Sequence, residues 1–180
     1  MAGIQEEIQT MNLYDLHSNP EELHGYSTRE YKIPELAFNL AVNRPGLRPK
    51  LEPYIMKDPK WAYWYAKSIL KSPWPEAEPV IIKDPTVAAD YAIFILRRPW
   101  PEAEPYIMKN AFHAWLYASQ MLKRRWPEAE PYIMKDADSA YLYTKDILRR
   151  RWPEAEPVIL KDRVWGPECA RSFKIKQDEI

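Results

Sequence analysis

The sequence predicts an all-α protein, a short α-solenoid of about five helical hairpins of 26 residues with caps at both ends. Three observations support this prediction: a six-residue motif recurs at a fixed interval, prolines fall near expected helix ends, and an apolar stripe with helical spacing repeats. The motif WPEAEP begins at Trp74, Trp100, Trp126 and Trp152. A degenerate copy, RPKLEP, begins at Arg48, so units are expected to start at residues 48, 74, 100, 126 and 152.

Each unit is expected to form two helices. In the unit that begins at Trp74, Pro75 and Pro79 fit the start of a first helix of about nine residues, where N–H groups lack partners. Asp84 is an N-cap residue for a second helix, which is expected to run up to Pro99. One repeat therefore corresponds to one helical hairpin.

The second helix of each unit carries apolar residues at spacings of three and four, which mark one buried face. In the unit that begins at Trp74 these residues are Ala88, Tyr91, Ala92, Ile95 and Leu96. A single hairpin cannot bury this face, so stacked hairpins are expected to form a continuous core. The tryptophan of the WPEAEP motif is expected to pack across the junction between units.

Both ends of the chain depart from the repeat. Residues 1–47 are expected to form an N-terminal helical cap, residues 48–165 the tandem repeats, and residues 166–180 a C-terminal cap, all within one structural domain. Residues 32–43 resemble the second helix of a unit, and Gly166 and Pro167 replace the alanine and the aromatic residue of earlier units.

Composition limits the classes of function. The 180 residues include 26 basic and 26 acidic side chains, so the chain has no overall bias toward nucleic acid or an anionic membrane. The single cysteine, Cys169, excludes an internal disulfide and a thiolate zinc cluster. The first residues lack a signal-peptide pattern and no apolar stretch approaches about 20 residues. We therefore expect a cytoplasmic protein that does not enter membranes.

The combination of "NPEELHGY", "IPELAF" and tandem "WPEAEPYIMKD…AYLYTKDIL" resembles a group of mostly uncharacterised repeat proteins encoded by tailed bacteriophages and related genomes. The resemblance spans nearly the whole chain, although Arg48, Lys50 and Leu51 replace Trp, Glu and Ala in the first unit. It implies a viral protein that acts in the bacterial cytoplasm, and it brings no catalytic residues with it.

The sequence shows no pattern typical of an enzyme. His17, His24 and His113 lack acidic or cysteine neighbours at metal-site spacing. No phosphate-binding loop, nucleophile elbow or dinucleotide fingerprint occurs among the four glycines. Glutamate pairs such as Glu76 and Glu78 recur in the four units that begin with WPEAEP and are interpreted as first-turn residues that complement the helix dipole. We expect neither catalysis nor a cofactor or metal.

Candidate binding residues are those of the second helices that vary between units, which also include Thr86, Asp90 and Phe94. The set chosen for aromatic or basic character is Lys60, Trp61, Trp64, Lys67, Phe112, His113, Trp115 and Tyr141. Aromatic rings beside cations are typical of binding hot spots. They favour a scaffold that binds a macromolecular partner, most of all a host protein, for example a host-defence component. Packing against adjacent layers or a homodimer seam is the alternative for these rings.

Basic clusters precede the later units, and their candidate binding residues are Arg124, Arg125, Arg149 and Arg150. We interpret them as a column that is neutralised by the glutamates of the following unit. The alternatives are a groove for nucleic acid, or a site in which aromatic and basic side chains sequester a small nucleotide signal.

Overall fold

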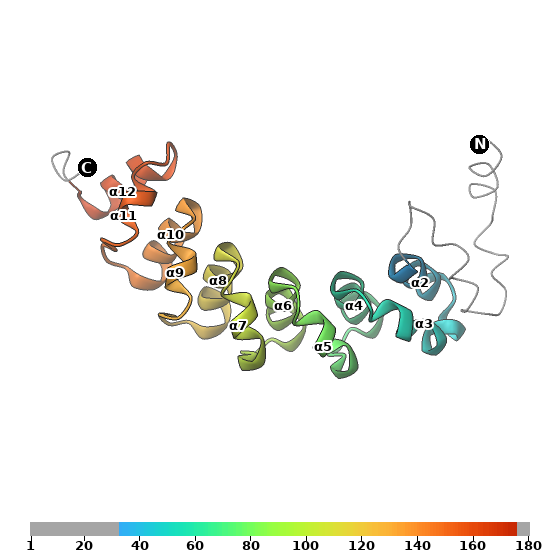
Figure 1. Cartoon of the computed structure of the whole chain (residues 1–180). Helices are drawn as coiled ribbons and strands as arrows, with labels where there is room; N and C mark the ends of the chain where they lie inside the picture. The colour runs from blue at the N-terminus through green and yellow to red at the C-terminus, as the bar shows by residue number, and fades with distance from the viewer. Residues whose placement is uncertain (1–32, 176–180) are drawn as a thin grey trace, which may run out of the picture.

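The computed structural model describes residues 33–175, which form a curved row of helical hairpins (Figure 1). These residues contain helices and turns but no strand, which confirms the all-α prediction. The second helices lie along the inner side of the arc (Figure 1): α4 (Pro59–Tyr65), α6 (Pro85–Tyr91), α8 (Ala111–Tyr117) and α10 (Ala137–Tyr143). Three shorter first helices lie along its outer side: α5 (Glu78–Ile81), α7 (Glu104–Ile107) and α9 (Glu130–Ile133).

The two ends of the row differ from its middle. At the first end, α2 (Ile33–Asn43) packs against α3 (Arg48–Ile55), the first helix of the degenerate unit. At the last end stand α11 (Glu156–Ile159) and α12 (Trp165–Phe173). None of the helices within residues 33–175 combines the length and the apolar character needed to cross a membrane.

The first helices are shorter than the sequence predicts. In the unit of Trp74 a 3-10 turn, η4 (Pro75–Ala77), precedes the four-residue helix α5. Because Pro79 has no N–H, it cannot bond the carbonyl oxygen of Pro75, and the backbone N–H of Glu78 bonds that oxygen instead. The same turn, η6 (Pro101–Ala103), precedes α7.

The second helices begin where the sequence predicts. The side chain of Asp84 accepts hydrogen bonds from the backbone N–H groups of Thr86 (2.9 Å) and Val87 (3.0 Å). Asp58, Asn110 and Asp136 cap α4, α8 and α10 in the same way. These caps satisfy N–H groups that have no partner within the helix.

The second helices end earlier than predicted, and with a different geometry. Each widens into a five-residue π-helical turn: η3 (Ala66–Leu70), η5 (Ala92–Leu96), η7 (Ala118–Leu122) and η8 (Thr144–Leu148). The N–H of Arg97 bonds the carbonyl oxygen of Ala92 at 2.8 Å, and Arg97 itself is left-handed, with φ 54°. The reversal at this residue ends the helix before Pro99. A left-handed Lys or Arg recurs at Lys71, Arg97, Lys123, Arg149 and Lys174.

A buried tyrosine connects each second helix with two first helices. The hydroxyl of Tyr91 accepts a hydrogen bond from the N–H of Trp74 (2.6 Å) and donates one to Glu78 (3.2 Å). The Tyr91 ring meets the ring of Trp100 in the next unit, with centroids 5.4 Å apart. Burial raises the pKa of Tyr91 to about 12, so the hydroxyl keeps its proton. Trp100 therefore packs across the junction, as the sequence predicts.

The last unit changes this arrangement. Cys169 stands where the earlier units have tyrosine, and Arg151 holds Glu156 through contacts of 2.9 and 2.8 Å. Gly166 replaces the alanine of earlier units because α12 passes close to the preceding turn. A Cβ atom on Gly166 would lie 2.6 Å from the carbonyl oxygen of Leu160.

Candidate binding surface on the second helices

The exposed stripe of the first unit carries two lysines and a tryptophan. Lys60, Trp64 and Lys67 are spaced by four and three residues, so they share one face of the helix that begins at Pro59. All three are exposed, and 39% of the surface of Trp64 is accessible. Since the buried face of this helix packs into the row, the stripe faces away from it.

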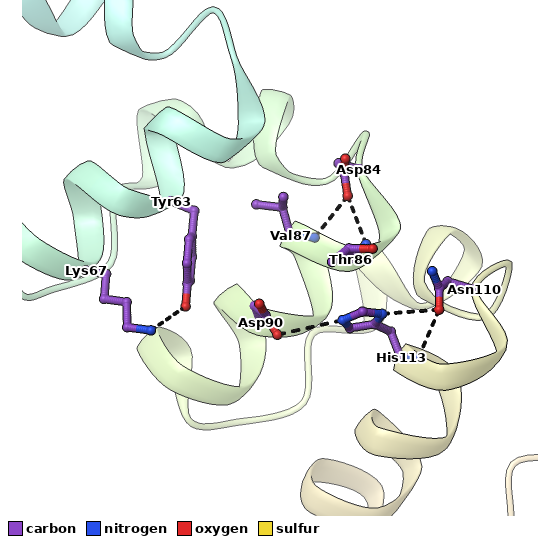
Figure 2. A network of polar contacts seen from close by, with 8 residues as sticks. All are labelled: Tyr63, Lys67, Asp84, Thr86, Val87, Asp90, Asn110 and His113. Carbon is purple, nitrogen blue, oxygen red and sulfur yellow. Dashed lines mark hydrogen bonds and ion pairs between the residues drawn. The ribbon is translucent and has the colours of Figure 1, made fainter. Parts of the chain in front are cut away.

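Lys67 is at the centre of a group of aromatic rings from two units. Its Nζ atom donates a hydrogen bond to the hydroxyl of Tyr63 at 2.7 Å (Figure 2). The same atom lies 5.1 Å from the ring centroids of Tyr63 and Trp64 and 4.9 Å from that of Phe94. Phe94 belongs to the next unit and is 50% exposed. Cation–π attraction therefore holds Lys67 in place between neighbouring hairpins.

Asp90 and His113 form a second polar contact, across the junction between α6 and α8 (Figure 2). The His113 Nε2 atom lies 3.9 Å from the Asp90 carboxylate. Its Nδ1 atom is 3.1 Å from the Asn110 side-chain oxygen, which also accepts the backbone N–H of His113. Because an amide oxygen only accepts, the neutral ring carries its hydrogen on Nδ1 and turns an unprotonated Nε2 toward Asp90.

Burial moves the pKa values of this pair in opposite directions. Burial raises the pKa of Asp90, and the nearby charges of His113 and Lys67 lower it in part. Burial lowers the pKa of His113, and Asp90 and Asp84 oppose that effect. Both groups are half-buried, so this junction is sensitive to mild acid.

Three of the predicted binding residues pack between units instead of facing solvent. Trp61 is half-buried against Phe38, with ring centroids 5.1 Å apart. Trp115 is half-buried and donates a hydrogen bond from Nε1 to Asp146 at 3.2 Å. Tyr141 is fully buried and stacks on Trp165 at 4.8 Å. For these three rings, packing against adjacent layers accounts for the aromatic side chain.

Four of the five remaining predicted residues of the second helices lie at the surface. Lys60, Trp64, Lys67 and Phe112 are exposed, whereas His113 is half-buried. Phe94 is at a variable position and is not among the predicted binding residues, although it contacts Lys67 directly. The sequence signal for Phe94 is an aromatic side chain at a position that is polar in the other units. We define the inner surface as Lys60, Trp64, Lys67, Phe94 and Phe112.

One residue of the basic column, Arg125, is held in an ion pair although half of its side chain is exposed. Arg125 forms a two-pronged ion pair with Glu130, with contacts of 2.6 and 2.7 Å, and this bond lowers the pKa of Glu130. Glu130 is only 7% exposed. The neutralising interpretation therefore holds for Arg125. Arg124, Arg149 and Arg150 are exposed, and Arg149 is one of the left-handed residues that end helices.

Residues 33–175 contain no group of three His, Cys, Asp or Glu side chains placed to hold a metal ion. Comparison with models of known protein families, with curated proteins and with solved structures gave no match.

Proposed function

We propose that this protein is a non-enzymatic scaffold that binds a protein partner along the inner surface. One observation carries the proposal: three large aromatic side chains are exposed on consecutive second helices. Trp64 is 39%, Phe94 50% and Phe112 46% accessible. The alanine and tyrosine positions that build the core are the same in these units, so the core does not require these three rings.

The composition of the surface supports a protein partner. Aromatic residues supply a large share of the binding energy in protein interfaces, mainly where they cluster. Lys67 orders Trp64 and Phe94 before any partner arrives, which reduces the side-chain entropy lost on binding. We further propose, from the resemblance to bacteriophage repeat proteins, that the partner is a bacterial host protein, with host-defence components as one class.

The test compares two faces of the same chain. Trp64→Ala combined with Phe94→Ala removes two rings of the inner surface. Tyr106→Ala is the matched control, because Tyr106 is 39% exposed on α7 at the outer side and also carries a lysine over its ring, Lys109 at 5.3 Å. Proteins captured from bacterial lysate by the tagged chain are identified by mass spectrometry.

We expect a partner that the double variant loses and the control retains. The reverse pattern, with capture lost only in Tyr106→Ala, would contradict the proposal. A small nucleotide that co-purifies at equimolar ratio would favour sequestration of a nucleotide signal instead. Circular dichroism of both variants checks that the helices remain.

A second candidate, nucleic-acid binding, is favoured by the left-handed residues. Every one of these five positions within residues 33–175 is Lys or Arg, although glycine fits this conformation best. Exposed glutamates such as Glu128 and Glu154 nearby reduce the local charge, which makes this the weaker candidate. Arg149→Glu with Arg150→Glu should abolish salt-sensitive oligonucleotide binding if it exists, and Lys161→Glu should not.

A further inference from the structure

Positive charge is concentrated in the unit that carries Lys60, Trp64 and Lys67 of the inner surface. Residues 48–73 contain six basic and two acidic side chains, a net charge of plus four, whereas the whole chain has none. Two of the six, Lys60 and Lys67, flank Trp64 on the exposed stripe. In the next unit Thr86 and Ile93 stand at the two lysine positions, so the positive stripe is local.

Both lysines of the stripe are held in place by aromatic rings. The Lys60 Nζ atom lies 4.9 Å from the Trp61 ring centroid, and Lys67 is held by the three rings described above. An ammonium group has three N–H donors, and the one hydrogen bond that Lys67 makes to Tyr63 leaves two for an outside acceptor. The Asp90 carboxylate lies near enough for the charge of Lys67 to lower its pKa in part, and its contact of 3.9 Å is with His113 (Figure 2).

We propose that this stripe, Lys60, Trp64 and Lys67 together with Phe94, recognises an acidic segment of the partner protein that also carries apolar side chains. Carboxylates of the segment contact the two ammonium groups, and its apolar side chains cover the rings of Trp64 and Phe94. The proposal rests on the proposed function and adds the chemistry of the partner.

Single-stranded nucleic acid fits the same residues less well. Nucleobases bind protein surfaces by stacking on aromatic faces. The Lys67 ammonium already lies over the rings of Trp64 and Phe94, so at most one face of each ring remains for a base to stack on. A carboxylate instead adds to the ammonium and leaves its ring contacts intact. The observations therefore favour an acidic peptide over an oligonucleotide.

The probe is a fluorescein-labelled peptide of about twelve residues in which glutamate alternates with leucine, titrated into the full chain and followed by anisotropy. The binding should weaken about tenfold in Lys60→Gln with Lys67→Gln, since close charge pairs across interfaces carry couplings of this size. Lys57→Gln with Lys109→Gln is the matched control, because these lysines also lie over tyrosine rings, at 5.2 and 5.3 Å. The same peptide with glutamine for glutamate should not bind.

Three results would overturn the proposal: equal loss in the control variant, equal binding of the glutamine peptide, or tighter binding of a labelled oligonucleotide to the same residues. A fourth result would show that an acidic segment of the chain itself binds the stripe. Residues 1–32 are the candidate, because they hold six acidic and two basic side chains. The full chain alone is treated with a carbodiimide. A cross-link from residues 1–32 to Lys60 or Lys67 would mean that this segment, and not an outside partner, occupies the stripe.

The two proposals fail in different ways. If Trp64→Ala with Phe94→Ala loses the captured partner and Lys60→Gln with Lys67→Gln retains it at full affinity, the binding surface stands and its acidic specificity is wrong. If both pairs retain the partner, the inner surface is not the binding surface.

Discussion

The hydroxyl of Tyr91 lies 2.6 Å from the backbone nitrogen of Trp74, seventeen positions earlier in the chain. The N–H of Trp74 stands at the start of a first helix, where it has no helical partner. The tyrosine supplies that partner from the second helix, and Glu78 accepts a hydrogen bond from the same hydroxyl. One buried side chain therefore closes the hairpin on itself while its ring contacts the next unit.

Tyr117→Phe should lower the free energy of unfolding by about 1–3 kcal/mol, because it leaves the buried N–H of Trp100 without a partner. Tyr141→Phe is the matched control. Among residues 33–175 the buried Tyr141 hydroxyl has no hydrogen-bond partner, so its removal should be neutral or stabilising. Urea denaturation followed by circular dichroism measures both, and equal losses would contradict the role given to Tyr117.

Arg97→Gly should be more stable than Arg97→Ala by about 1 kcal/mol. Both variants lose the same charge, so the comparison isolates the left-handed backbone at φ 54°. Alanine keeps the Cβ atom that this conformation disfavours, and glycine does not. Thermal unfolding of the pair measures the difference, and an alanine variant as stable as the glycine variant would mean that the backbone here carries no strain.

Gly166→Ala should cost about 1–3 kcal/mol, the range of overpacked sites, because the new Cβ would meet the backbone oxygen of Leu160 at 2.6 Å. Gly46→Ala provides the control, since no atom of the part of the chain that the structure describes lies within 4 Å of a Cβ at that position. We expect its effect to stay within about 0.5 kcal/mol. A larger loss at Gly46 than at Gly166 would refute the close approach of α12.

Stability should fall as the pH drops below the ordinary pKa of histidine, near 6.5, because of His113. Folding lowers the pKa of His113. In acid the folded protein therefore binds a proton at this imidazole less well than the unfolded chain does. The raised pKa of Asp90 acts in the opposite direction, at lower pH. His113→Gln should flatten the change in urea midpoint between pH 7.5 and about 5.5, and an unchanged slope would exclude His113 as its cause.

The parts of the fold that the sequence predicts are those encoded by neighbouring residues. A proline or an N-cap such as Asp84 acts on N–H groups two or three positions away, so helix starts follow from local pattern. The recurrence of Trp and Tyr at fixed intervals indicates stacking without any knowledge of the contact geometry.

The candidate site was less predictable because its contacts cross between units. Lys67 and Phe94 are 27 positions apart, and only the stacking of hairpins determines that they meet. The same applies to Trp115 and Asp146. Trp115 is expected at the surface, but its hydrogen bond to Asp146 holds it in the junction between units. Left-handed Arg97 was equally hidden, because its conformation follows from the π-helical turn before it and not from a glycine.

The tyrosine-to-tryptophan contacts determine where this protein could be lengthened. A second copy of residues 100–125 inserted before Trp126 would find Tyr117 ahead of it and would present its own tyrosine to Trp126. A copy added after α12 would meet Cys169, whose thiol has no ring to receive an incoming tryptophan. Further repeats can therefore be inserted inside the array, whereas a repeat added after α12 would lack the tyrosine ring that the other junctions provide.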